Sequence, residues 1–493
     1  MSPKSFPAIE GLRALFGFWI VALHQHMIQK CLLALYKRMD LLQILSTTVW
    51  SGIAIGHGYQ VDFFFALSAF LFTWGIMNTQ SNTRNSVIDA VKSLFLFVVK
   101  RVLRLWPVLI AVLAIAVAVN DYGARDMVSL LKTMAIPTYF DEIPQAAVPA
   151  WSNRVDIEAC VVIFVLIKIF QWCGCLNTFT ALLAVPVSLV PKALRFLSDP
   201  DKYSYMRLGA DLLTTAIMIP QVRQEYYRDF LFKGQMPWFE SMDTVYRMTP
   251  LFFGEYIVQH QRWSPAFAGF AMAVALYSAH RSHEKNKERP QSNGIIASTL
   301  RVLYRIFSLF LLLVSILLAG MPVLMSLSPA TEEVRTTMLA NPPLEADFVI
   351  SVLGRTLNSI GWCYLLYRCL LPKGHVLRLN YFAAFLEQPV FQWLGRHSYC
   401  VYMLHYMVLH FVSLSLLSPT KMEAIVGIQT GETLLTEFAL RLAATYSITL
   451  CAAVIIVRYI EEPALRVVQS QTKKLESILF GYKKEDNKGH KTA

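Results

Sequence analysis

An arginine and a histidine with helical spacing are the first residues of this sequence that point to chemistry. Arg13 and His24 are eleven positions apart in the apolar stretch 10–26. At ~100° and ~1.5 Å per residue, both project from one face of a helix and lie ~16 Å apart along its axis. If Arg13 lies at a membrane surface, His24 lies near the middle of a ~30 Å hydrocarbon layer. Glu10, one turn before Arg13, shares that face and is expected to pair with it.

An ionisable side chain at that depth has two interpretations. Such groups usually face the protein interior or a wet cavity and carry a function, and a neutral imidazole there can serve as a general base. The alternative is a core histidine that is hydrogen-bonded to another helix. The position of His24 alone gives the two interpretations equal weight.

Two arginines form the second candidate site. Arg101 and Arg104 are three positions apart, directly before an apolar segment, and Lys100 precedes them. Guanidinium groups with this spacing share a helix face, and they predict a cytosolic basic pocket for phosphates, which arginine binds bidentately. The more common role of such residues is to anchor a span to lipid headgroups, and that alternative stays open.

Acidic residues at the ends of apolar segments are the third set of candidates. Asp156 lies in the polar run 151–158 before a long apolar segment, and Asp62 opens another. A carboxylate can orient a histidine or a polar acceptor, whereas its simpler role is to favour the helix N-terminus. A stripe with the spacing i, i+3, i+6 is more typical of helix packing than of catalysis and comprises Tyr399, Tyr402 and His405.

The composition requires that helices within a membrane position these residues. Of the 493 residues, 55% are hydrophobic and only 16% are charged, which is too little charge for a soluble protein. The net charge of +12 collects in short loops between apolar segments, and this distribution argues against a nucleic-acid partner. The close pair Cys173 and Cys175 lacks further ligands, so no metal site is expected. The sequence predicts an all-α, polytopic transmembrane helical bundle in a lipid bilayer.

The charge pattern predicts roughly ten to twelve spans, with both termini cytosolic. The basic connectors 84–104 and 280–305 are expected on the cytosolic side, and the acidic segments 121–150 and 332–347 on the far side, together with Asp156. Residues 1–465 are predicted to form the membrane domain and 466–493 a basic cytosolic tail that is partly disordered. Nothing in the sequence separates an endomembrane from the plasma membrane. The expected spans lie near 12–28, 59–77, 105–119, 155–171, 176–190, 208–220, 248–260, 265–279, 303–326, 348–371, 391–413 and 437–457.

Six short motifs occur in one order along the chain, and together they resemble the acyltransferase-3 family of multi-span membrane O-acyltransferases. The segment 246–254 adds a similarity to the nose-resistant-to-fluoxetine branch of that family. Glu10 stands where the family pattern has aspartate, and Ala69 where it has glycine. The matching residues are Gly11, Leu12, Arg13 and His24; Val61, Asp62, Phe64, Phe65, Ser68 and Phe70; Arg101, Arg104 and Pro107; Trp151, Ser152 and Asp156; Ser398, Tyr399, Tyr402 and His405; and Glu461 and Pro463.

The resemblance implies the transfer of an acyl group, most often acetyl, from cytosolic acyl-CoA to a hydroxyl of a carbohydrate, lipid or other acceptor. The expected co-substrate is acetyl-CoA or another acyl-CoA, and no metal is expected. His24 would be the general base. The implied residues are His24, Arg13 and Asp156 in catalysis, Arg101, Arg104 and Ser68 in binding acyl-CoA, and Glu10, Asp62, Tyr402 and His405 as further candidates.

Two other classes of function stay open at this stage. A transporter would also use charged groups within the membrane, although inverted repeats would be expected and the two halves of the chain show no internal similarity. A lipid-binding relative without transferase activity is consistent with Ala69, whereas the presence of His24 argues against it.

Overall fold

The computed structural model describes a protein whose elements are all helices. The described residues are 6–35, 38, 40–41, 44, 59–79, 86–118, 151–200, 263–287, 295–326, 344–410, 412 and 430–480. Within them the all-α prediction is confirmed. Two of the expected spans, near 208–220 and 248–260, lie outside the described residues, as does the segment 246–254.

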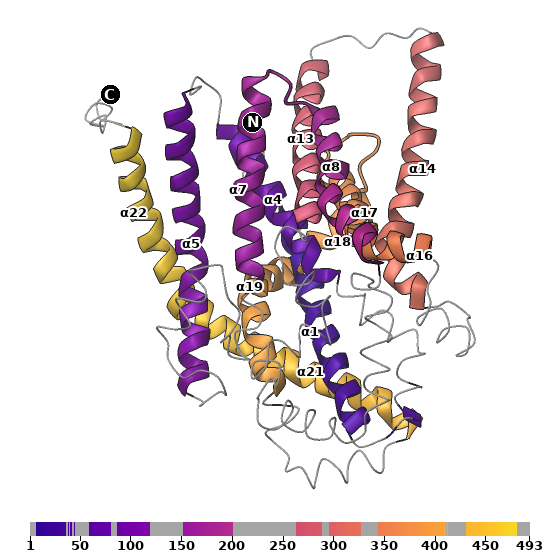
Figure 1. The fold of residues 1–493 in the computed structure, drawn as a ribbon, viewed down its shortest axis with the longest axis vertical. Coiled ribbons are helices and arrows are strands. Elements are labelled where there is room, and N and C mark those ends of the chain that lie inside the picture. The colour runs from indigo at the N-terminus through magenta and orange to yellow at the C-terminus, as the bar shows by residue number, and fades with distance from the viewer. Residues whose placement is uncertain are drawn as a thin grey trace.

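The helices form one bundle (Figure 1). In the first half of the chain they are α1 (Pro7–Leu35), α4 (Gln60–Thr79), α5 (Val87–Ala118), α7 (Trp151–Trp172) and α8 (Thr178–Ser198). In the second half they are α13 (Trp263–Lys287), α14 (Ile295–Ser326), α16 (Leu344–Phe348), α17 (Gly354–Leu370), α18 (Asn380–Leu386), α19 (Pro389–His410), α21 (Gly431–Ile456) and α22 (Glu462–Phe480). Single π-helical turns, Val349–Leu353 and Val457–Glu461, precede α17 and α22.

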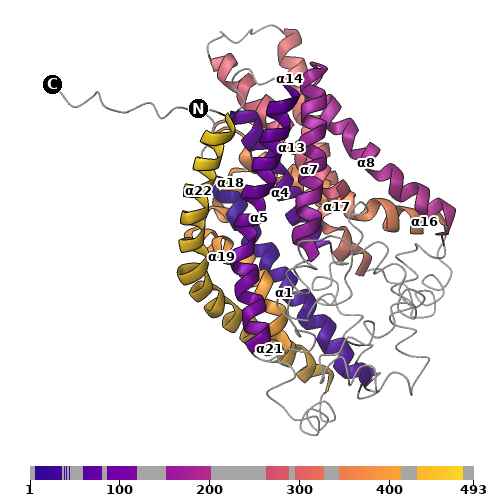
Figure 2. The same cartoon turned by 60° about the vertical axis from the view of Figure 1, so that its left-hand side comes forward.

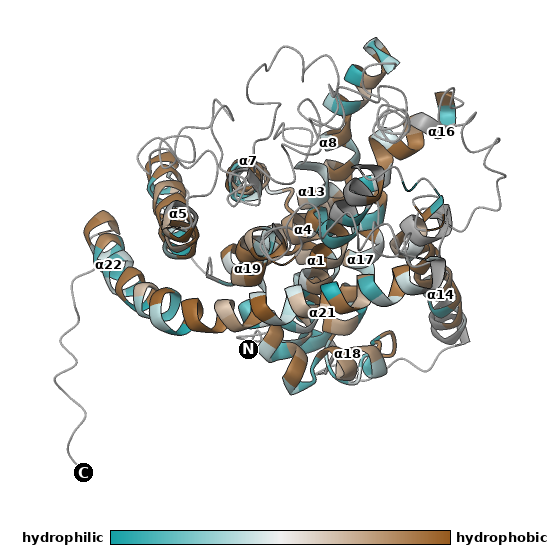
Figure 3. Cartoon of the chain, turned by 90° about the horizontal axis from the view of Figure 1, so that it is seen from below, coloured by the Kyte–Doolittle hydropathy of each residue, from teal (hydrophilic) through white to brown (hydrophobic). Residues whose placement is uncertain are grey.

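Apolar length and outward-facing apolar side chains fit a membrane environment. Five stretches among the described residues are long and apolar enough to cross a bilayer: Gln60–Asn78, Thr178–Ser198, Val302–Met321, Val349–Leu370 and Thr433–Phe480. On α14, large side chains such as Leu309, Phe310 and Leu313 are more than half exposed. Figure 3 shows hydrophobic segments on the peripheral helices α5, α21 and α22 as well as in the centre. Such faces are stable when lipid covers them.

Helix α5 is longer than the sequence pattern predicts. The sequence predicts a cytosolic connector over 84–104 and a span that begins at Trp106 and Pro107. Instead the helix runs unbroken from Val87 to Ala118 with Pro107 inside it. The prediction of a connector was wrong because its lysines and arginines interrupt a segment that is otherwise apolar and helix-forming. Arg101 and Arg104 consequently lie midway along a helix.

The C-terminal tail also continues as a helix. The tail predicted from residue 466 is helical to Phe480, and 481–493 lie outside the described residues. Figure 2 shows α22 rising beside α5. Lys100 of α5 donates to Glu476 of α22 at 2.9 Å and joins the two helices. The amphipathic tail is therefore packed against the bundle over the part that the structure describes.

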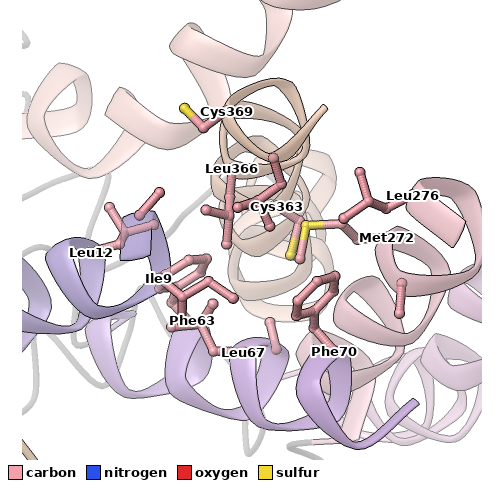
Figure 4. Packing of buried hydrophobic residues seen from close by; sticks show 14 of the residues in the cluster. Ile9, Leu12, Phe63, Leu67, Phe70, Met272, Leu276, Cys363, Leu366 and Cys369 are labelled. Atoms are coloured by element: carbon pink, nitrogen blue, oxygen red, sulfur yellow. The ribbon is translucent and has the colours of Figure 1, made fainter. Parts of the chain in front are cut away.

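The core at the centre of the bundle joins α1, α4, α13 and α17. Figure 4 shows Ile9 and Leu12 of α1 facing Leu366 of α17, with Phe63, Leu67 and Phe70 of α4 alongside. Close backbone contact between α4 and α13 depends on Gly269, because a Cβ there would lie 1.8 Å from the carbonyl oxygen of Ala66. Small residues at such crossings let membrane helices pack closely.

Ring contacts in this core set the register of three helices. Phe6, directly before α1, meets Phe70 of α4 at 5.6 Å, and Phe16 of α1 meets Phe63 of α4 at 4.4 Å, so α1 and α4 are antiparallel. Trp362 of α17 packs on Phe16 at 5.0 Å. We call Phe16, Trp19, Phe63 and Trp362 the aromatic layer. Because Ile9 and Leu12 face Leu366, α17 is antiparallel to α1 as well.

Candidate active site

The first predicted contact is present at the start of α1. Arg13 donates through Nη1 to Oε1 of Glu10 at 3.1 Å. The expectation that these residues pair across one helical turn is thus confirmed. Both side chains are partly exposed, so the pair contributes little stability by itself. Its effect is to hold the Arg13 guanidinium along the face that carries His24.

His24 lies against a second histidine from α19. Nδ1 of His24 is 2.9 Å from Nε2 of His405, and the two rings are 4.8 Å apart. His405 is completely buried, whereas His24 is partly exposed. Tyr402 stacks on His405 at 5.8 Å. The structure therefore brings His24 of α1 together with Tyr402 and His405 of α19, which are far from it in the sequence.

Two backbone carbonyls determine where the protons of these imidazoles lie. Nδ1 of His405 is 2.6 Å from the carbonyl oxygen of Tyr402, and Nδ1 of His24 is 3.0 Å from that of Ile20. A carbonyl only accepts, so each Nδ1 carries the hydrogen in the neutral rings. The single Nδ1 hydrogen of His24 is then shared between the carbonyl oxygen of Ile20 and Nε2 of His405, which both accept from it. Nε2 of His24 keeps its lone pair, and it has no hydrogen-bond partner among the described residues.

Arg101 makes a different set of contacts from the one expected. Its Nε donates to Oδ2 of Asp156 at 2.9 Å, and its Nη2 contacts both Asp156 and Ser68. The prediction that Asp156 lies across the membrane from Arg101 is wrong, because a salt bridge requires one depth. The physical reason is the continuous helix α5, which carries Arg101 into the bundle beside the start of α7.

Arg104 is the arginine of this site whose donors are uncommitted. Its side chain is exposed and forms no hydrogen bond or salt bridge with any described residue. The charged groups that act on it are Arg13, Arg101, Asp156 and Glu461. Since Arg13 and Arg101 are paired with carboxylates, Arg104 is the guanidinium best suited to bind an anion. We call Arg101, Arg104, Asp156 and Ser68 the arginine cluster.

Helix α19 connects the arginine cluster to the histidines. Tyr399 accepts from Nδ2 of Asn153 at 3.2 Å and donates to the carbonyl oxygen of Leu105 at 3.2 Å. One turn further, Tyr402 stacks on Phe64 of α4 at 6.4 Å.

The same contacts give the depth that separates the two sites. Phe64 and Tyr402 lie at one depth because their rings stack. Ser68 follows Phe64 by four residues on α4, and His405 follows Tyr402 by three residues on α19, which runs in the opposite direction. At ~1.5 Å per residue, the arginine cluster and the two histidines are therefore roughly 10 Å apart in depth.

Asp62 pairs with an arginine that the sequence analysis missed. It is fully buried and accepts from Nη1 of Arg355 at 2.7 Å. Arg355 is itself 5% exposed and lies over the ring of Tyr59 at 5.2 Å. The simpler of the two roles left open for Asp62, a helix start, is incomplete, since Arg355 of α17 matches its charge. An arginine inside the apolar span 348–371 was a signal that could have identified this partner.

The alanine that departs from the family pattern faces protein. Ala69 is completely buried in an apolar cluster with residues such as Val155 of α7 and Phe270 of α13. Its neighbour Ser68 projects to Arg101 instead. The extra methyl group of Ala69 therefore packs in the core and takes no space from the arginine cluster.

Comparison with known proteins assigns the chain to a family. The model of the acyltransferase domain known as acyltransferase-3 matches residues 6–458, which contain both histidines and the arginine cluster. No curated protein and no solved structure matches the chain significantly. The match does not resolve the nose-resistant-to-fluoxetine branch. Among the described residues no group of histidines, cysteines or carboxylates suits a metal ion. The chain belongs to the acyltransferase-3 family of membrane acyltransferases.

Proposed function

We propose that the protein transfers an acyl group, most often acetyl, from acyl-CoA to a hydroxyl of an acceptor, with His24 as the general base. The observation that carries the proposal is the hydrogen-bonded chain from Tyr402 through His405 to His24, which leaves Nε2 of His24 ready to accept a proton. Proton transfer by such a positioned base typically contributes about 10²–10⁴-fold to a rate.

Arg104 is the proposed contact for the phosphates of acyl-CoA. Guanidinium groups bind phosphate through paired hydrogen bonds, and the donors of Arg104 are free within the described residues. Arg101 holds Asp156 and Ser68 in place beside it. The thioester arm of the donor then spans the roughly 10 Å of depth between the arginine cluster and His24.

The charge pattern supports a cytosolic donor side. Trp74, near the end of α4, lies 5.7 Å from His280 of α13, just before the basic stretch that the positive-inside rule assigns to the cytosol. Ser68 lies on this side of Phe64, whereas Asp62 lies on the other. In this proposal acyl-CoA approaches from the end of the bundle where the C-termini of α4 and α13 lie. The acceptor meets His24 from the opposite end.

In the proposed reaction a single base, His24, accounts for both proton transfers. Nε2 of His24 takes the proton of the acceptor hydroxyl as its oxygen attacks the thioester carbon. The tetrahedral intermediate collapses, the carbon–sulfur bond breaks, and the protonated His24 returns the proton to the leaving thiolate. The products are the acyl ester and free CoA. Arg13 and Asp156 act by positioning charged groups, Asp156 through its ion pair with Arg101.

The proposal is tested by acetyl-CoA binding and CoA release with the detergent-purified protein. We expect wild type to bind acetyl-CoA and release CoA, and Arg104→Ala to bind it weakly. Arg466→Ala, which removes an exposed arginine of α22, serves as the matched control and should bind like wild type. If no variant binds acetyl-CoA while the reconstituted protein moves a solute across vesicles without it, the protein is a transporter and the proposal fails.

A further inference from the structure

Three central helices each keep one accessible residue within a stretch that is otherwise buried. Every residue of these stretches is buried except one: His24 within 20–26 of α1, Phe64 within 59–70 of α4, and Tyr402 within 400–406 of α19. Apolar rings at the centre of a bundle are normally enclosed by their neighbours. The accessible surface of Phe64 and Tyr402 therefore needs an explanation.

Direct contacts join these three residues to one another. The ring of Tyr402 lies 6.4 Å from that of Phe64 and 5.8 Å from that of His405. Nε2 of His405 is in turn 2.9 Å from Nδ1 of His24. Because the residues adjoin, their accessible surfaces border one space inside the bundle that solvent reaches.

The arginine cluster lies next to Phe64, on the side away from the histidines. Ser68 follows Phe64 by four residues on α4, so their side chains share one face of the helix. Ser68 contacts Nη2 of Arg101 from that face. The rings of Phe64 and Tyr402 thus lie between the arginine cluster and His24. A molecule that contacts both the arginine cluster and His24 passes these rings.

The same two rings lie where the apolar cores of the bundle meet. Phe63 and Phe65, the chain neighbours of Phe64, are 0% and 3% exposed, and each belongs to a single core cluster. Phe64 packs against both of these clusters without being enclosed by either. Tyr402 packs against the second of them and against a third cluster with members on α5, α19 and α21. Ring surface that no core covers is available to a ligand.

The chemistry of this surface suits the uncharged part of acyl-CoA. A phosphate placed against two aromatic rings would lose its hydration without gaining a positive partner. The arm of acyl-CoA between the phosphates and the thioester is a slender chain of methyl, methylene and amide groups, which can bury its apolar surface against aromatic rings. The rings consequently favour the arm and leave the phosphates at Arg104.

We propose that Phe64 and Tyr402 bind the arm of acyl-CoA, and that Phe64 is a specificity-determining residue for the acyl donor. Contact with the arm fixes how far the donor enters the bundle, so the thioester comes to lie at the level of Nε2 of His24. The identity of the ligand rests on the proposed function.

The first test separates the arm from the phosphates by binding alone. The probes are S-acetylpantetheine, which is the arm without the nucleotide, 3′-phospho-ADP, which is the nucleotide without the arm, and acetyl-CoA. We expect Phe64→Leu to weaken S-acetylpantetheine and acetyl-CoA about fourfold, the value of roughly one buried methylene group, and to leave 3′-phospho-ADP unchanged. Arg104→Ala should show the opposite pattern for the two fragments. Saturation-transfer difference NMR titrations with the purified protein measure both fragments.

The matched control is Phe18→Leu. Phe18 is 43% exposed and contacts Tyr446 of α21 at 5.1 Å, on a different face of α1 from His24, so this variant should bind all three probes like wild type. Unchanged binding of 3′-phospho-ADP shows that Phe64→Leu is folded. Wild-type binding of S-acetylpantetheine by Phe64→Leu, or an equal loss of both fragments, overturns the proposal.

The second test distinguishes this proposal from the transfer reaction. Release of CoA from acetyl-CoA is followed with wild type, Phe64→Leu and Phe18→Leu, and the KM for acetyl-CoA should rise about fourfold in Phe64→Leu alone. Binding of S-acetylpantetheine that depends on Phe64, without CoA release by wild type, supports the arm contact and overturns the transferase proposal. CoA release with one KM in all three proteins supports transfer and overturns the arm contact.

Discussion

Two arginine–aspartate pairs in this bundle look alike in sequence and differ in their surroundings. Arg101 and Asp156 join α5 to α7, with side chains 18% and 12% exposed. Arg355 and Asp62 join α17 to α4, with side chains 6% and 0% exposed. The first pair lies beside Arg104, which has no partner of its own among the described residues. The second lies between α17 and α4, with the guanidinium of Arg355 over the ring of Tyr59.

The difference in exposure indicates which role each ion pair can have. A partly exposed pair next to an uncommitted guanidinium suits phosphates, because an anion can reach Arg104 from water without a large desolvation cost. A fully buried pair is neutral toward a ligand and fixes the helices around it. We therefore propose the arginine cluster as the site of the acyl-CoA phosphates and the Asp62–Arg355 pair as a structural contact. The predictions that follow test this division.

The largest effect is expected from breaking the buried pair. Asp62→Ala leaves Arg355 buried without its carboxylate and should lower the free energy of unfolding by about 3–5 kcal/mol. Asp156→Ala should cost clearly less, because Arg101 is closer to solvent and keeps its contact with Ser68. Denaturation of both variants in detergent measures the contrast. If both variants lost the same free energy of unfolding, the two ion pairs would not differ in the way proposed.

A smaller effect separates the two arginines of α5. Arg104→Ala should weaken acetyl-CoA binding by roughly 10–100-fold, the value of a hydrogen bond to a charged group, with little change in stability. Arg101→Ala should mainly lower stability, since it strands Asp156. Titration calorimetry and thermal unfolding of both variants measure this, with Arg104→Lys as the variant that keeps charge but loses the bidentate geometry. A loss of binding confined to Arg101→Ala would reverse the assignment.

A modest effect on stability is expected from the hydroxyl of Tyr399, which joins α19 to α5 and α7. Tyr399→Phe removes the contacts with Asn153 and the carbonyl of Leu105 and should cost about 0.5–1.5 kcal/mol of stability. Tyr381→Phe is the matched control, because Tyr381 is 95% exposed. Thermal unfolding compares the two variants. Identical melting temperatures would show that Tyr399 does not hold α19 against α5 and α7.

The smallest effect is expected at the edge of the arginine cluster. Glu476→Gln removes the exposed salt bridge with Lys100 and should change stability by less than about 1 kcal/mol. Because salt screens exposed charges, wild type and variant should become indistinguishable in unfolding measured at high ionic strength. A large loss that persists in high salt would mean that the tail helix contributes to the bundle through this contact.

Several features of the fold could be predicted from local pattern. The span expected at 59–77 matches α4. The length of the continuous apolar run gives the length of the helix, and Asp62 in its first turn marks the start. The pair Glu10 and Arg13 was predictable from spacing alone. The N-terminal half of α5 could not be predicted in this way. Its lysines and arginines look like a connector between spans if charged residues are assumed to lie outside membrane helices.

The site was only partly predictable, because its contacts cross between helices. The sequence singled out His24 and His405 separately, but no spacing rule places residues of α1 and α19 together. Their contact depends on the packing of those helices. Arg355 was missed because it belongs to no motif.

The central claim is that His24 is the base and that His405 orients it. The most direct measurement is single-turnover CoA release from bound acetyl-CoA by wild type, His24→Ala, His405→Ala and His405→Gln, with the acetyl-CoA affinity of each determined in parallel. We predict that His24→Ala binds acetyl-CoA normally and loses at least about 10²-fold in rate. His405→Ala should lose less, and His405→Gln, which can still accept from Nδ1 of His24, should recover part of the rate. A His24→Ala variant that transfers at the wild-type rate would contradict the account.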